Sequence, residues 1–92
     1  MEKSKFKKLE RIVKGFANHR RIQILKLLEK NPELSVTEIS EKLNINIKTA
    51  SEHIRRLAIS GLVLKRNQAN NVRHKPSLLG KDILKFLRKL EY

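Results

Sequence analysis

The sequence predicts a mainly helical domain with one small β-hairpin, in the element order α-α-α-α-β-β-α. Apolar residues recur at helical spacing through most of the chain. Polar residues of the kinds that cap helices divide this pattern into separate segments. Between residues 62 and 76 the helical period gives way to two short strands around an asparagine-rich turn. A chain of 92 residues is long enough for one domain, which we expect to span residues 1–92.

The first two helices are predicted from their apolar spacing and their ends. Apolar residues recur every three or four positions over residues 5–17, with Lys and Arg on the other face. Asn18 is a typical N-cap for a second helix, whose apolar stripe includes Leu25 and Leu28. Because proline disfavours a helical conformation in the residue before it, Asn31-Pro32 should end this helix.

Two further helices over residues 36–60 are short and lie close together in the sequence. Ser35-Val36-Thr37-Glu38 has the pattern of a capping box, which opens the third helix. After a three-residue break, Asn46 can cap a fourth helix over residues 47–60, and Gly61 suits a left-handed C-terminal cap. One stripe of the fourth helix is apolar and should face the core: Ala50, Ile54 and Leu57.

A hairpin and a last helix complete the chain. Residues 62–66 and 72–76 are predicted to be its strands, and the Asn70-Asn71 pair suits the positive φ of a tight turn. The last helix should cover residues 80–91. A helix-turn-helix at 36–60 followed by a two-stranded wing at 62–76 is the pattern of a winged helix-turn-helix.

The charge balance favours a nucleic acid as partner. The chain has 22 Lys and Arg against 9 Asp and Glu, a formal net charge of +13. So large an excess on so short a chain implies self-repulsion unless a polyanion is bound. With no cysteine the chain has no disulfides, and no apolar run is long enough for a signal peptide or a membrane span. We therefore expect a cytoplasmic, nucleoid-associated protein.

The fourth helix and the wing supply the candidate DNA contacts. At 100° per residue, Lys48, Glu52 and Arg55 lie opposite the buried stripe. Residues in the first two turns of such a helix usually meet base edges in the major groove, whereas later arginines suit phosphates. The wing should contact the DNA backbone. The complete set is Asn46, Lys48, Thr49, Ser51, Glu52, Arg55, Arg56, Lys65, Arg66, Arg73, His74 and Lys75.

A simpler interpretation of this helix face is a solvated surface of mixed charge. Glu52 fits either interpretation, since its carboxylate can accept a hydrogen bond from cytosine or can only orient a nearby lysine.

Two stretches of the chain resemble ArsR-type winged-helix transcriptional regulators. Residues 17–28 are similar to the opening of such proteins, and residues 46–57 with 60–63 are similar to their recognition helix and its exit. The likeness covers roughly residues 6–90. It implies a homodimer that binds operator DNA, with the first and last helices as the dimer interface.

The chain departs from the metal-sensing members of that family. Ser35 and Thr37 stand where those members have a Cys-x-Cys, and hydroxyls do not replace thiolates on a soft metal. The three histidines are not spaced as a metal site; His53 suits a structural role and His19 an exposed one. We expect no metal site and no cofactor, and the sequence does not identify a small-molecule effector.

The terminal helices contain more apolar residues than one small core needs. Either they close that core, or they pair with a second copy, which we favour because three central helices already form a winged core. The expected dimer interface is Leu9, Ile12, Val13, Phe16, Ile83, Phe86, Leu87 and Leu90.

Together these observations predict a sequence-specific regulator of transcription, a repressor, that binds double-stranded DNA. The fourth helix should read the major groove. The alternative is an architectural protein that coats DNA through charge with little sequence preference, which the lysines of the first helix also suit. No Gly-rich phosphate loop, nucleophile elbow or paired carboxylates suggest catalysis, so we do not expect an enzyme.

Overall fold

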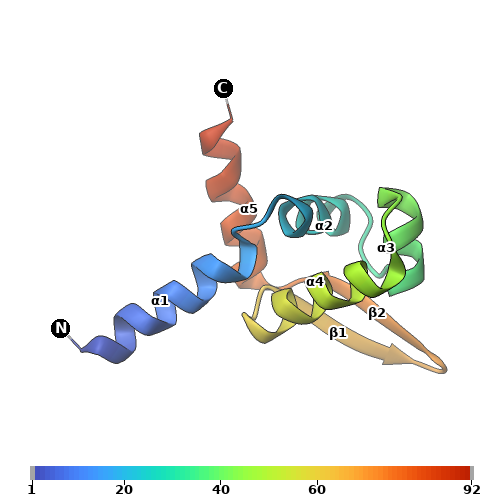
Figure 1. The fold of residues 1–92 in the computed structure, drawn as a ribbon, viewed down its shortest axis with the longest axis horizontal. Helices are drawn as coiled ribbons and strands as arrows, with labels where there is room; N and C mark the ends of the chain where they lie inside the picture. Colours follow the sequence, from blue (N-terminus) through green and yellow to red (C-terminus); the bar gives the residue numbers. More distant parts are fainter. Residues whose placement is uncertain (1, 92) are drawn as a thin grey trace.

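The computed structural model describes residues 2–91 and has the predicted order of elements (Figure 1). The wing extends from one end of the molecule, whereas α1 and α5 project from the other end in different directions (Figure 1). The elements are α1 (Lys3–Phe16), α2 (His19–Lys30), α3 (Val36–Leu43), α4 (Ile47–Ile59), β1 (Val63–Gln68), β2 (Asn71–Pro76) and α5 (Leu78–Leu90).

The helix starts are fixed by the predicted side-chain caps. Asn18 Oδ1 accepts from the backbone N–H of Arg20, at 2.9 Å, and of Arg21, at 3.1 Å. The capping box at α3 is complete, with Glu38 N–H donating to Ser35 Oγ and Ser35 N–H donating to Glu38 Oε1. Asn46 Oδ1 accepts from the Lys48 N–H at 2.7 Å. Because each cap satisfies donors that the first turn leaves free, these helices begin where the sequence predicts.

The core gathers around α2, and every other helix contributes to it. Its fully buried aliphatic residues include Ile24, Leu25 and Leu28 of α2. The predicted stripe of α4 is confirmed, since Ala50, Ile54 and Leu57 are all buried. Phe16 was expected in a dimer interface, but it is only 8% exposed and packs into this core, so that prediction is wrong.

The wing is an antiparallel pair of strands tied to the loop before α3. Its register pairs Val63 with Pro76 at the base and Gln68 with Asn71 at the tip. The turn differs from the prediction, because the residue with positive φ is Ala69, at 54°, and not one of the Asn70-Asn71 pair. Near the base, His74 N–H donates to the Leu34 carbonyl at 3.0 Å, and Leu34 forms an isolated antiparallel β-bridge with His74 on the outer side of β2.

Two glycines allow the terminal helices to approach the body closely. A Cβ atom on Gly15 would lie 2.2 Å from Ser60 Oγ, and one on Gly80 would lie 2.2 Å from the Leu62 carbonyl oxygen. Contacts this short are far inside van der Waals distance, so the lack of a side chain lets α1 meet the end of α4 and lets α5 meet the backbone just before β1. Gly61 has φ +77°, which confirms the predicted left-handed cap of α4.

Candidate nucleic-acid interface

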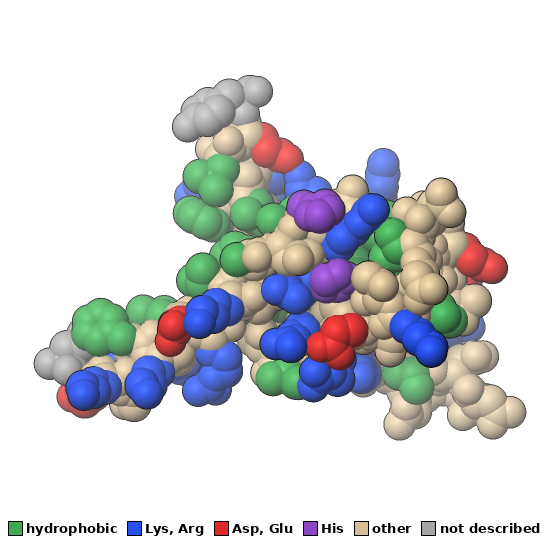
Figure 2. Space-filling model, viewed as in Figure 1, with side chains coloured by type: hydrophobic (Ala, Val, Ile, Leu, Met, Phe, Trp, Pro, Cys, Tyr) green, Lys and Arg blue, Asp and Glu red, His purple; other side chains and the backbone are tan. Residues whose placement is uncertain are grey.

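The face of α4 opposite its buried stripe is exposed along the whole helix. Figure 2 shows Lys and Arg side chains gathered over α4, with an acidic group among them. Each residue of this helix that the sequence assigns to DNA contact is exposed: Lys48, Thr49, Ser51, Glu52, Arg55 and Arg56. Asn46 is exposed as well, while its side chain caps the helix. The cap and the buried stripe hold this face rigidly outward.

Glu52 binds both arginines on this face. Its carboxylate accepts from Arg55 at 2.9 and 2.8 Å and from Arg56 at 2.9 Å. The hydrogen bonds from Arg55, followed by the one from Arg56, lower the pKa of Glu52 to about 2. Lys48 has no ion-pair partner among residues 2–91, so its ammonium is available in the first turn.

Two of the wing's basic residues are engaged with the protein itself. Arg66 pairs with Glu33 at 2.6 Å. Arg73 is half-buried, donates to the Glu33 carbonyl oxygen at 2.9 Å and lies 3.4 Å from the carboxylate of Glu38. In the structure Arg73 therefore links the wing to α3 and to the loop before it, whereas the sequence suggested a phosphate contact for this residue.

The two lysines of the wing have a different environment. Lys65 and Lys75 are exposed, and neither forms an ion pair within the described part of the chain. They are the wing cations that are free to meet a phosphate.

His74 does not reach the surface, so the expected phosphate contact at this residue is wrong. Its side chain is 1% exposed, and Nδ1 lies 2.9 Å from the Leu34 carbonyl oxygen. Burial lowers the pKa of His74, which keeps the ring neutral at physiological pH. The ring anchors β2 to the loop before α3.

His53 is half-buried, and its Nδ1 has no hydrogen-bond partner among the described residues. Burial and, after it, the charge of Arg21 lower the pKa of His53. The ring is thus neutral and packed beside the start of α2, in agreement with a structural role.

The residues present do not fit a soft-metal site. Ser35 Oγ is occupied by the capping bond from Glu38, and residues 2–91 hold no cluster of three or more His, Asp and Glu placed to bind a metal ion. Nor is any helix in this range long and apolar enough to span a membrane.

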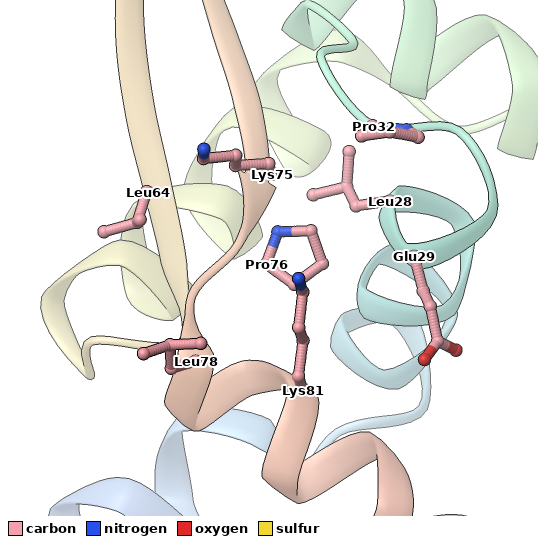
Figure 3. A pocket seen from close by; sticks show the side chains of 8 residues that line it. All are labelled: Leu28, Glu29, Pro32, Leu64, Lys75, Pro76, Leu78 and Lys81. Carbon is pink, nitrogen blue, oxygen red and sulfur yellow. The ribbon is translucent and has the colours of Figure 1, made fainter.

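A hollow of about 250 Å³ lies at the base of the wing, between α2, the strands and α5 (Figure 3). Its lining is mostly aliphatic, and Lys81 reaches toward Pro76 while Glu29 points away (Figure 3). The Glu29 carboxylate is bound by Arg88 at 3.0 Å.

The terminal helices present apolar faces to solvent. Phe6, Leu9 and Val13 on α1 are about half exposed, and so are Phe86 and Leu90 on α5. Ile12, Ile83 and Leu87 lie at the edge of the core and are partly buried. Of the predicted interface residues, only Phe16 is taken up by the core.

Sequence reasoning missed the part that Glu33 plays. This residue has φ +71°, and it contacts the wing through its backbone N–H, its carbonyl and its carboxylate. Its only local signal is its place after Pro32 in a loop, because its partners lie 33 to 41 positions away in the sequence.

Comparisons with known proteins agree with this geometry. A sequence profile described as "Winged helix-turn-helix DNA-binding" matches residues 18–63. The transcriptional activator HlyU of Vibrio cholerae is 42% identical over 72 residues, which span 78% of this chain and 65% of HlyU. The chain thus matches just under two thirds of that relative's length.

Solved structures extend the likeness to nearly the whole chain. A structure of HlyU from Vibrio cholerae is 37% identical, with a TM-score of 0.81, and the match covers 99% of this chain and 98% of that one. A homodimeric winged helix-turn-helix domain of Mb0332 from Mycobacterium bovis, a possible ArsR-family regulator, is 29% identical. Its TM-score is 0.82, over 95% of this chain and 80% of that one. The predicted resemblance to ArsR-type regulators is thereby confirmed.

Proposed function

Because this chain belongs to the winged helix-turn-helix DNA-binding family, we propose that it is a transcriptional regulator that binds double-stranded DNA in a sequence-dependent way. The recognition helix α4 enters the major groove, and the lysines of the wing contact the backbone. The protein acts in the cytoplasm, where DNA is accessible to it, and it is not an enzyme.

The single observation that supports this function best is the exposed face of α4. A free Lys48 and the hydroxyls of Thr49 and Ser51 occupy the first turns, where side chains of a recognition helix reach base edges. Polar groups of this kind discriminate between bases, which a uniformly basic surface does not do.

A second copy of the chain covers the apolar faces of α1 and α5. Five large apolar side chains that are about half exposed on these helices are costly to leave in water and suit an isologous contact: Phe6, Leu9, Val13, Phe86 and Leu90. A two-fold dimer places two recognition helices on one duplex, which the Mb0332 homodimer supports by analogy.

The direction of regulation stays a prediction. The sequence suggested a repressor, whereas HlyU is named a transcriptional activator. Direction depends on where the bound site lies relative to a promoter, which the fold does not set.

Competition binding tests the proposal. Preferred duplexes are first selected from a random pool, and a labelled preferred duplex is then competed with unlabelled random DNA at about 0.15 M salt. A sequence-specific regulator retains a preference of about 10³-fold or more. Failure to bind any duplex would disprove the proposal. A preference below about tenfold would favour the architectural alternative, which binds through charge.

A further inference from the structure

The face of α1 that points away from its apolar side is a stripe of four cations. Lys3, Lys7, Arg11 and Lys14 are spaced by four, four and three residues, which places them on one side of a helix. All four are exposed. Figure 2 shows Lys and Arg side chains along one edge of α1 and hydrophobic side chains along the other.

This stripe runs into a cleft of about 290 Å³ between α1 and the end of α4. Gly15 lies in this cleft and lets α1 lie against Ser60, the C-cap of α4. Seven residues line it: Arg11, Lys14, Gly15, Arg55, Arg56, Ile59 and Ser60. Four of these seven are cations, and the two on α1 lie more than 40 positions before the two on α4.

The charges around the cleft are not balanced within the described residues. Lys14 pairs with Glu10 at 3.2 Å, and Arg55 and Arg56 share Glu52. Arg11 has no ion-pair partner among residues 2–91. Two carboxylates thus face four cations, and Lys7 and Lys3 continue the positive charge beyond the cleft. Like charges gathered in this way favour an anion between them.

The length of the stripe indicates an extended anion. At a rise of 1.5 Å per residue, Lys3 to Lys14 covers roughly 16 Å along the helix. A single free phosphate would occupy only the cleft and leave the outer lysines unused, whereas a nucleic-acid backbone presents charges at repeated intervals. The stripe also begins beside Arg55 and Arg56, on the helix that is proposed to read the major groove.

We propose that α1 is a second DNA-contacting element: its cationic stripe and the cleft at its junction with α4 bind phosphodiester groups that flank the segment read by α4. The inference rests on the proposed function and extends it. It gives α1 two roles on opposite faces, one toward a second copy and one toward the DNA backbone. No base is read there, so these contacts add affinity and position without sequence preference.

The test compares two duplexes that contain the same preferred site, one ending at the site and one extended by about ten base pairs on each side. The double variant Lys7→Gln/Arg11→Gln removes two charges from the stripe and keeps helix propensity high. The matched control Lys85→Gln/Lys89→Gln removes two exposed charges at the same spacing from α5. Melting curves and sedimentation confirm that fold and oligomeric state are unchanged.

Wild-type protein should bind the extended duplex more tightly than the short one, and the Lys7/Arg11 variant should lose this advantage. We expect the variant to lose roughly tenfold in affinity for the extended duplex at about 0.15 M salt. Its plot of log affinity against log salt should be shallower by about one unit per lost contact. The affinity of the control variant for both duplexes should stay within about twofold of that of wild type.

Three results would overturn the inference. The Lys7/Arg11 variant could bind both duplexes with the affinity of wild type. Alternatively, the Lys85/Lys89 control could lose as much affinity as the Lys7/Arg11 variant, which would make net charge the cause. In an NMR titration, inorganic phosphate alone could shift the Arg11 Nε–H resonance and reach saturation at submillimolar concentration. That result would assign the cleft to a free anion. Each of these leaves selective DNA binding intact, whereas loss of all DNA binding by the wild-type chain would disprove the proposed function itself.

Discussion

The carboxylate of Glu52 and the guanidinium of Arg55 form a two-pronged ion pair on the exposed face of α4, with N–O distances of 2.9 and 2.8 Å. Arg56 donates to the same carboxylate from the next position. The paired arginines lie along the helix and present less positive charge to an approaching duplex. Glu52 therefore restrains two arginines that we propose to contact the DNA backbone without sequence preference.

Replacing Glu52 with Gln should raise the affinity for random DNA. Without the carboxylate both arginines can turn toward phosphates, and the salt slope should steepen by about one unit for each arginine that gains a contact. Anisotropy titrations over a salt series on random and preferred duplexes would measure this. The ratio of the two affinities should fall. An unchanged random-DNA affinity would show that the ion pair does not restrain the arginines.

Replacing Lys48 with Ala should weaken binding to the preferred duplex by about 1–3 kcal/mol and affect random DNA much less. The Lys48 ammonium is exposed at the first turn of α4 and can donate to O6 or N7 of guanine. Parallel titrations on the two duplexes separate the effects. Equal losses on both would mean that Lys48 contacts the backbone rather than a base.

Arg73 and Lys75 are neighbours on β2 but should respond differently to replacement with Ala. Arg73→Ala removes a charged donor from the Glu33 carbonyl and should lower the free energy of unfolding by about 1–2 kcal/mol. Lys75 is exposed, so Lys75→Ala should change the free energy of unfolding by less than about 0.5 kcal/mol. It should weaken binding to all duplexes to the same extent. Urea unfolding and DNA titration of both variants test the distinction. It fails if Arg73→Ala is as stable as wild type.

Stability should fall in mild acid because of His74. Burial lowers the pKa of the folded-state ring below the ordinary value of 6.5. As pH drops below about 6.5 the unfolded chain takes up more protons than the folded one, so the free energy of unfolding decreases until the folded ring is itself protonated. Above about pH 6.5 the stabilisation that the neutral His74 ring contributes is fully present.

Urea unfolding between pH 7.5 and 5 measures this dependence. His74→Asn should be less stable at pH 7.5 and should show a flatter pH profile. Burial also lowers the pKa of His53, so His53→Gln serves as the comparison that removes the other contribution of the same sign. Identical profiles for wild type and His74→Asn would contradict the prediction.

Charge on the exposed face of α5 or α1 should prevent dimerisation. Phe86→Glu and Leu9→Glu each place a carboxylate on a half-exposed apolar face without disturbing the buried core. Sedimentation velocity should show a monomer for both, and affinity for a two-fold symmetric duplex should fall sharply. Lys85→Glu, one residue from Phe86 and likewise exposed, should remain dimeric. A dimer that survives both apolar replacements would place the interface elsewhere.

The features that the sequence predicts well are those fixed by neighbours in the chain. Asn18, the Ser35–Glu38 box and Asn46 all cap the predicted helices, because a cap needs only residues two or three positions away. The buried stripe of α4 follows from helical periodicity in the same way, and with it the exposed face that carries Lys48.

Predictions failed where a distant partner decides the outcome. His74 lies between two cations in the sequence, yet Leu34, 40 positions earlier, takes it into the interior. Phe16 has the spacing of the exposed face of α1, but it lies where α1 meets the body and is drawn into the core. Neither local composition nor periodicity contains these contacts. They arise only when the loop before α3 meets the wing and α1 meets the body.

Gly15 lies where α1 meets the end of α4, and this junction bears on how two copies of the chain would sit on DNA. In a two-fold dimer joined through α1, the angle between α1 and α4 determines the separation of the two copies of α4, and Gly15 fixes that angle through its contact with Ser60. Because half-sites on one face of DNA repeat every 10–10.5 base pairs, a small rotation at this junction shifts the preferred spacing without changing the bases recognised. We therefore expect a side chain at position 15 to alter the half-site spacing that such a dimer prefers.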